Sequence, residues 1–109
     1  MGKPITQARA ETKGAVGFMK WFAERAPGAL KAQEIDTSNG VRLRLGYEPL
    51  GSLLVIQPWN FPFFLPLKNS IPSLLAGNTV LLKPAPCVPQ TSLLLQSIME
   101  EAGLANGEY

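Results

Sequence analysis

Histidine is absent from the 109 residues of this sequence, and cysteine occurs once, as Cys87. Without histidine, the chain cannot form a Ser-His-Asp triad, a Cys-His pair, a histidine general base or a zinc site that includes histidine, and we predict no metal site. A single cysteine excludes a disulfide within the chain and is typical of a reducing compartment. The first nine residues also lack the apolar run of a signal peptide, so we expect a cytoplasmic protein.

An excess of charge of either sign is lacking too, because ten Lys and Arg residues stand against eight Asp and Glu residues, for a net charge of +2. This balance gives no electrostatic case for binding nucleic acid. Between Glu48 and Glu100 the only charged residues are Lys68 and Lys83, and there is no carboxylate. We expect this central stretch to be buried on most sides or to face something other than water.

Residues 49–67 carry no charge, so they must be considered as a membrane span. Prolines recur there at every fourth position, as Pro58, Pro62 and Pro66. Each interior proline removes a backbone hydrogen bond from a helix, and unpaired backbone groups in lipid cost several kcal/mol each. We therefore predict no spanning helix, and treat surface binding of segment 58–67 to lipid as a weaker alternative.

The N-terminal third predicts a helix, a connector and a strand. Residues 3–25 have apolar side chains at helical spacing, with Glu11 among the charged residues placed on the opposite side, and Pro27-Gly28 predicts the end of this helix. Residues 28–40 are expected to be a connector that ends in a turn at 37–40. Residues 41–45 alternate strictly, which is typical of a half-solvated strand that is antiparallel or at a sheet edge.

The remaining residues predict a β-α-β-α order. A strand is expected at 52–56, where a short apolar run is typical of a strand buried on both faces, and a second apolar strand is expected at 79–83, ending at Lys83. A helix is expected at 61–76, with Pro62 in its first turn, a kink at Pro72 and a left-handed stop at Gly77-Asn78. Another helix is expected at 89–102, with an apolar face that includes Leu94, Leu95 and Ile98. This order argues for an α/β fold with a parallel sheet. Since two strands leave open edges, the chain either associates with a partner or belongs to a larger sheet.

In such sheets, ligands bind at the carboxyl ends of the strands, where segments 57–62 and 83–86 emerge. Asn60 has two interpretations: an N-cap of the following helix, or an amide donor to a developing oxyanion. Lys83 is either a solvated strand end or a cation that meets the ribose or phosphate oxygens of a nucleotide. Trp59 is expected to be a packing residue and Cys87 an inert thiol, and no glycine-rich phosphate loop is present.

Five short motifs in register resemble the aldehyde dehydrogenase superfamily, closest to its succinate-semialdehyde dehydrogenase-like members. They are Glu48-Pro49-Leu50-Gly51, Pro58-Trp59-Asn60-Phe61-Pro62, Ala76-Gly77-Asn78-Thr79, Leu82-Lys83-Pro84 and Glu101-Ala102-Gly103-Leu104, and residues 1–8 are similar as well. Beside the helix and connector at 1–36, the resemblance implies an oligomerisation-type hairpin region at 37–51 and a partial, Rossmann-like NAD(P)-binding domain at 52–109. It also implies an oxidoreductase that binds an aldehyde and is a homo-oligomer at full length.

The resemblance assigns roles residue by residue. Asn60 matches the asparagine that holds the carbonyl oxygen of the substrate, and Lys83 matches the lysine that binds the adenosine ribose. Gln57, Pro58 and Trp59 match the segment that lines the nicotinamide. Pro86 stands where many NAD-preferring members have a glutamate, so the preference between NAD and NADP stays open.

The residues that the family uses as nucleophilic cysteine and glutamate base have no match in this chain, and Cys87 does not correspond to that cysteine. We therefore expect a fragment of an NAD(P)-dependent aldehyde dehydrogenase that is inactive on its own. The alternative is a non-catalytic module that binds nucleotide or contacts another subunit.

Overall fold

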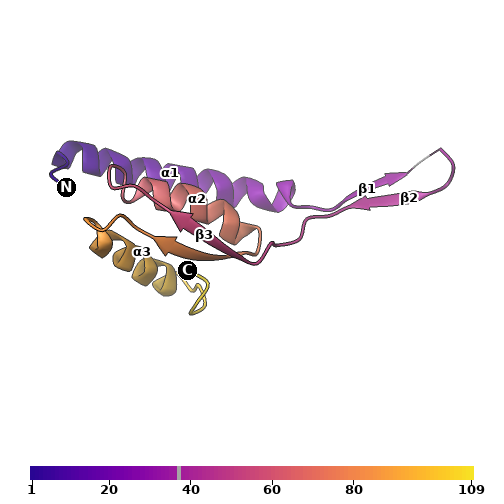
Figure 1. Cartoon of the computed structure of the whole chain (residues 1–109). Coiled ribbons are helices and arrows are strands. Elements are labelled where there is room, and N and C mark those ends of the chain that lie inside the picture. The colour runs from indigo at the N-terminus through magenta and orange to yellow at the C-terminus, as the bar shows by residue number, and fades with distance from the viewer. Residues whose placement is uncertain (37) are drawn as a thin grey trace.

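The computed structural model describes residues 1–36 and 38–109, so Thr37, in the predicted turn, lies outside the described residues. Within these described residues, three helices and four strands follow one another, and Figure 1 shows their arrangement. In order they are α1 (Ile5–Ala29), β1 (Gln33–Asp36), β2 (Arg42–Leu45), β3 (Ser52–Ile56), α2 (Phe64–Leu75), β4 (Thr79–Lys83) and α3 (Pro89–Glu101).

Helix α1 continues through the predicted stop, with Pro27 in its last turn. Proline removes one backbone donor, and this loss is small so close to the helix end, where the Leu30 amide still donates to the Ala26 carbonyl at 2.9 Å. The prediction for the polar side is wrong at Glu11, which is buried together with Ala15. The buried side of α1 thus includes a carboxylate.

Strands β1 and β2 form an antiparallel hairpin that extends away from the helices (Figure 1). The structure confirms an antiparallel strand near 41–45, while β1 lies in the segment expected to be a connector. Acidic and basic residues stand opposite one another in the register, Glu34 to Arg44 and Asp36 to Arg42. Ile35 lies opposite Leu43, and both are about half exposed, so the apolar side of the hairpin is uncovered.

Strands β3 and β4 pair in parallel, from Ser52 opposite Thr79 to Ile56 opposite Lys83, and α2 connects them. This confirms the β-α-β-α order. The prediction that strand 52–56 is buried on both faces is wrong, because Val55 is buried but Leu54 and Ile56 are 61% and 62% exposed. In β4, likewise, Val80 is buried and Leu81 is 67% exposed. Alternate residues of a strand point to opposite faces, so one face of this sheet is covered and the other is open.

Helix α2 begins at Phe64, three residues later than predicted, so Pro62 precedes the helix instead of occupying its first turn. It continues through Pro72 and ends before Gly77, whose φ of +84° confirms the predicted left-handed stop. The side-chain oxygen of the buried Asn78 then accepts from the Leu50 and Gly51 amides at 2.6 and 3.1 Å, which connects this turn to the residues just before β3.

The core lies where the three helices meet: Ala15 of α1, Leu67 of α2, and Leu95 and Met99 of α3 form one cluster. Helix α3 has nearly the predicted bounds and carries proline at its start. Its buried face centres on Leu95 and Met99, whereas Leu94 and Ile98, expected on the apolar face, are exposed. In residues 1–36 and 38–109, no helix is long and apolar enough to cross a membrane.

Candidate functional site

The carboxyl ends of β3 and β4 lie next to each other. Ile56 stands opposite Lys83, and the Gln57 amide donates to the Lys83 carbonyl at 3.1 Å, which extends the pairing by one residue. Segments 57–62 and 83–86 therefore leave the sheet at the same edge. The parallel sheet brings together the two segments that the sequence singled out.

Asn60 lies in the loop between β3 and α2 and is exposed. The interpretation of Asn60 as a helix cap is wrong, because α2 begins four residues later and its N-cap residue is Phe63. Instead, the backbone carbonyl of Asn60 accepts a hydrogen bond from Lys3 Nζ at 2.9 Å. The side-chain amide of Asn60 thus has no role in capping α2.

Lys83 ends β4 and is exposed, with Nζ donating to the Pro84 carbonyl at 3.0 Å. Around it, Gln57 is buried, whereas Pro58 and Pro86 are exposed. Trp59 is 58% exposed, so its prediction as a packing residue is wrong. The strand ends therefore present an aromatic ring, an amide and an ammonium group to the solvent.

Cys87 is a free, exposed thiol in the loop after β4. No group of three acidic, cysteine or histidine side chains that could hold a metal ion occurs in the part of the chain that the structure describes.

The sequence prediction missed Lys3 and Glu11. The Glu11 carboxylate accepts from the backbone amides of Phe63 and Phe64 at 2.8 and 2.9 Å, and it forms an ion pair with Lys3. Burial on its own raises the pKa of Glu11, but hydrogen bonds from Lys3 and from the two amides outweigh it and leave the pKa below its ordinary value. One feature of the sequence points to this residue: Glu11 follows Ala8 by three positions and precedes Ala15 by four, which places it on the buried face of the helix.

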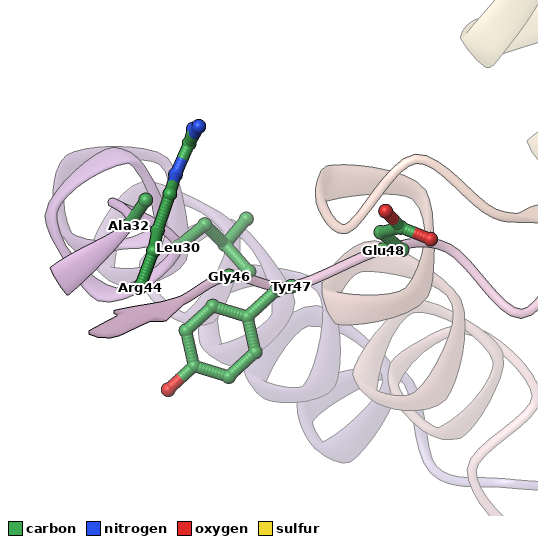
Figure 2. Close-up of a pocket in the computed structure, with 6 residues that line it drawn as sticks. All are labelled: Leu30, Ala32, Arg44, Gly46, Tyr47 and Glu48. Atoms are coloured by element: carbon green, nitrogen blue, oxygen red, sulfur yellow. The ribbon is translucent and has the colours of Figure 1, made fainter. Parts of the chain in front are cut away.

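A separate depression of about 750 Å³ lies where the hairpin joins α1. Leu30, Ala32, Arg44, Gly46, Tyr47 and Glu48 line it, and none of the predicted site residues does. Figure 2 shows the side chains of Arg44 and Tyr47 pointing in opposite directions, so its polar groups do not converge on one point. We therefore place the candidate site at the ends of β3 and β4 and not in this depression.

The edge of the sheet suits a ligand that is rich in oxygen and negatively charged. Asn60 can donate two hydrogen bonds from its amide, and Lys83 can donate three from its ammonium group. No carboxylate occurs between Glu48 and Glu100 in the sequence, so neither segment repels an anion. A carbonyl oxygen or a nucleotide fits such a set of donors.

The family model described as "Aldehyde dehydrogenase family" matches residues 1–108. The chain is 41% identical over all its 109 residues to succinate semialdehyde dehydrogenase (NAD(P)+) Sad of Escherichia coli K12, of which it covers 23%. It is 40% identical over 106 residues to 1-pyrroline-5-carboxylate dehydrogenase of Geobacillus sp. WCH70, of which it covers 21%. The chain thus spans less than a quarter of the length of these curated relatives.

Solved structures agree with the sequence relatives. The structure of Gox0499 matches the whole chain with a TM-score of 0.93 at 32% identity, over 24% of its own length. The NADP+ complex of succinic semialdehyde dehydrogenase from Streptococcus pyogenes matches 99% of the chain with a TM-score of 0.92 at 27% identity, again over 24% of its own length.

Proposed function

The chain belongs to the aldehyde dehydrogenase family, and on this basis we propose that it supplies part of the cofactor and substrate sites of an NAD(P)-dependent aldehyde dehydrogenase. The proposed reaction converts an aldehyde and water into a carboxylic acid. Bound NAD(P)+ would supply the acceptor for the hydride of the aldehyde carbon, and one proton would be released to water. Succinic semialdehyde is the proposed substrate, because the names of the E. coli and S. pyogenes relatives contain it.

The observation that carries this proposal is the juxtaposition of two strand ends, held by the hydrogen bond from the Gln57 amide to the Lys83 carbonyl. It puts the segments of Asn60 and Lys83 on one edge. We propose that Asn60 donates to the carbonyl oxygen of the aldehyde, where negative charge develops during the reaction. Lys83 is proposed to bind the ribose of the cofactor.

The residues around this pair are proposed to complete the cofactor site. We propose that Gln57, Pro58 and Trp59 line the nicotinamide, and the exposed ring of Trp59 supports this assignment because it is free to contact a ligand. Pro86 lies on the same edge as Lys83 and brings no carboxylate toward the ribose, so either NAD or NADP is proposed as the cofactor.

A hybrid enzyme tests the proposal, in which this chain replaces the matching segment of the E. coli relative Sad. We expect the hybrid to oxidise succinic semialdehyde, and Asn60→Ala to lower its kcat about 10²–10³-fold, which is the usual cost of removing one oxyanion donor. Asn69→Ala, at an exposed position on α2, is the matched control and should leave kcat unchanged. An Asn60→Ala hybrid as active as the control would refute the role of Asn60.

The 109-residue chain by itself is proposed to be inactive, because no residue in it matches the nucleophilic cysteine or the glutamate base expected from the family resemblance. The assay is the reduction of NAD+ or NADP+ by the purified chain with succinic semialdehyde. Measurable turnover would refute this part of the proposal.

A second candidate function, contact with another subunit, is favoured by the hairpin of β1 and β2. Its apolar side, with Ile35, Leu43 and Leu45, is about half exposed on a ribbon that extends from the helices (Figure 1). We propose that this side binds a second copy of the chain. In sedimentation, the chain should form dimers that Leu43→Glu abolishes and that Lys31→Glu, an exposed control, retains; equal sedimentation of both variants would refute it.

A further inference from the structure

The loop that carries Asn60 is held at three points, and two of them involve charged groups from α1 and the residues just before it. At its start, the Gln57 amide bonds to β4. In the middle, the Asn60 carbonyl accepts from Lys3 Nζ at 2.9 Å. At its end, the Phe63 and Phe64 amides donate to one oxygen of Glu11. The two contacts to Glu11 span 52 and 53 residues of sequence, and the contact to Lys3 spans 57.

Glu11 accepts hydrogen bonds from the backbone amides at the beginning of α2. The first amides of a helix have no partner inside the helix, and a carboxylate there also interacts favourably with the helix dipole. No side chain of the N-cap residue fills this role in α2. The carboxylate that does so comes from another helix and is almost completely buried, with 3% of its side chain exposed.

Lys3 links Glu11 to the loop. Its ammonium group pairs with the second carboxylate oxygen of Glu11, bonds to the Asn60 carbonyl and lies 4.0 Å from the centre of the Phe61 ring. Only 11% of the Lys3 side chain is exposed. The same cation thus contacts Asn60, the residue that follows it, and the carboxylate that holds the end of the loop.

We propose that Lys3 and Glu11 are positioning residues, which fix the backbone of the Asn60 loop so that the Asn60 amide is aimed at the reacting carbonyl oxygen. The proposal depends on the proposed function only for the role of Asn60. An oxyanion donor acts within about 2.7–3.1 Å of its target, and a displacement of about 1 Å can cost roughly 100-fold in rate. The contacts of Lys3 and Glu11 that fix the loop are therefore expected to affect kcat.

Lys3→Met is the sharpest test, because it removes the bond to the Asn60 carbonyl while Glu11 still holds α2. In the hybrid enzyme we expect it to lower kcat at least about tenfold and to leave the KM for NADP+ unchanged. Lys3→Arg keeps a charged donor and should restore most of the lost rate. Lys13→Met, at an exposed position on the same helix, is the matched control and should behave like the parent hybrid. A Lys3→Met hybrid with the parent kcat overturns the proposal.

A second measurement separates this proposal from the proposed function, because it uses the 109-residue chain and no turnover. In NMR spectra of Lys3→Met, the amide signals of Asn60 and Phe61 should shift and their heteronuclear NOE should fall, while those of Thr79 and Val80 in the sheet stay in place. Unchanged order at Asn60 overturns the positioning role, whether or not the hybrid is active. A hybrid without any turnover, together with the expected loss of order at Asn60, counts against the proposed function and supports the positioning role.

Discussion

Replacement of Glu11 by alanine is expected to be the most damaging change of a charged residue in this chain. The substitution removes the acceptor for two backbone amides at the start of α2, Phe63 and Phe64, and leaves the ammonium group of Lys3 without its carboxylate. Neither amide can turn to a partner inside its own helix. Loss of this one side chain on α1 therefore leaves two backbone amides at the start of α2 without an acceptor.

The magnitude follows from these contacts. A hydrogen bond to a charged group contributes about 1.5–3 kcal/mol, and loss of a helix cap typically costs about 1–2 kcal/mol. Because the half-buried amides regain some water, we expect Glu11→Ala to lower the free energy of unfolding by about 2–4 kcal/mol. Glu11→Gln keeps an acceptor oxygen but loses the ion pair, so we expect it to lower the free energy of unfolding by about 1 kcal/mol. Glu24→Ala, at an exposed position of the same helix, is the control and should change the free energy of unfolding by less than about 0.5 kcal/mol.

Urea unfolding of the 109-residue chain, followed by far-ultraviolet circular dichroism, measures these differences. It also tests their pH dependence. The pKa of Glu11 is lowered in the folded chain, so its contribution is complete above the ordinary value of 4.5 and is lost as the pH falls through the lowered value. The stability gap between the parent and Glu11→Gln should therefore close in acid. A Glu11→Ala variant as stable as Glu24→Ala, or a gap that stays constant in acid, would refute the reasoning.

Three more predictions concern the core, the C-terminus and the cofactor. Leu67→Ala should lower the free energy of unfolding by about 2–5 kcal/mol because Leu67 is fully buried, whereas Leu94→Ala, on the exposed side of α3, should cost less than about 1 kcal/mol in the same urea assay. Burial raises the pKa of Tyr109 to about 12, against the opposing effect of the Ser70 hydroxyl, so stability should fall as the pH rises from 10 through that value, and Tyr109→Phe should abolish this loss in alkaline unfolding curves. In the hybrid enzyme, Pro86→Glu should weaken NADP+ binding at least about tenfold relative to NAD+, as measured by fluorescence titration, because a carboxylate repels the additional phosphate.

Local patterns predicted the elements around the site well, because the forces that shape them act between near neighbours. Both strands of the parallel sheet were predicted from the apolar runs at 52–56 and 79–83. The end of α2 was predicted from Gly77. The β-α-β-α order then required both strands to run in the same direction. The placement of the Asn60 and Lys83 segments on one edge therefore follows from the sequence.

The errors arose where a local rule competed with a distant contact. Pro62 and Asn60 favour a helix that begins near 61, but α2 begins at Phe64, where Glu11 supplies the acceptors for its first amides. Trp59 is apolar enough to be assigned to the core, yet it lies in the loop between β3 and α2 and is 58% exposed.

What the sequence alone determined is the type and order of the elements other than β1, since backbone preferences and side-chain periodicity are properties of a few consecutive residues. The tertiary structure decided which face of the sheet is covered, which stripe of α3 is buried and what holds the Asn60 loop. These outcomes depend on residues more than fifty positions apart, such as Lys3 and Asn60. No local pattern specifies such a pair, because it forms only when α1 has packed beside α2 and has brought both charges to the loop.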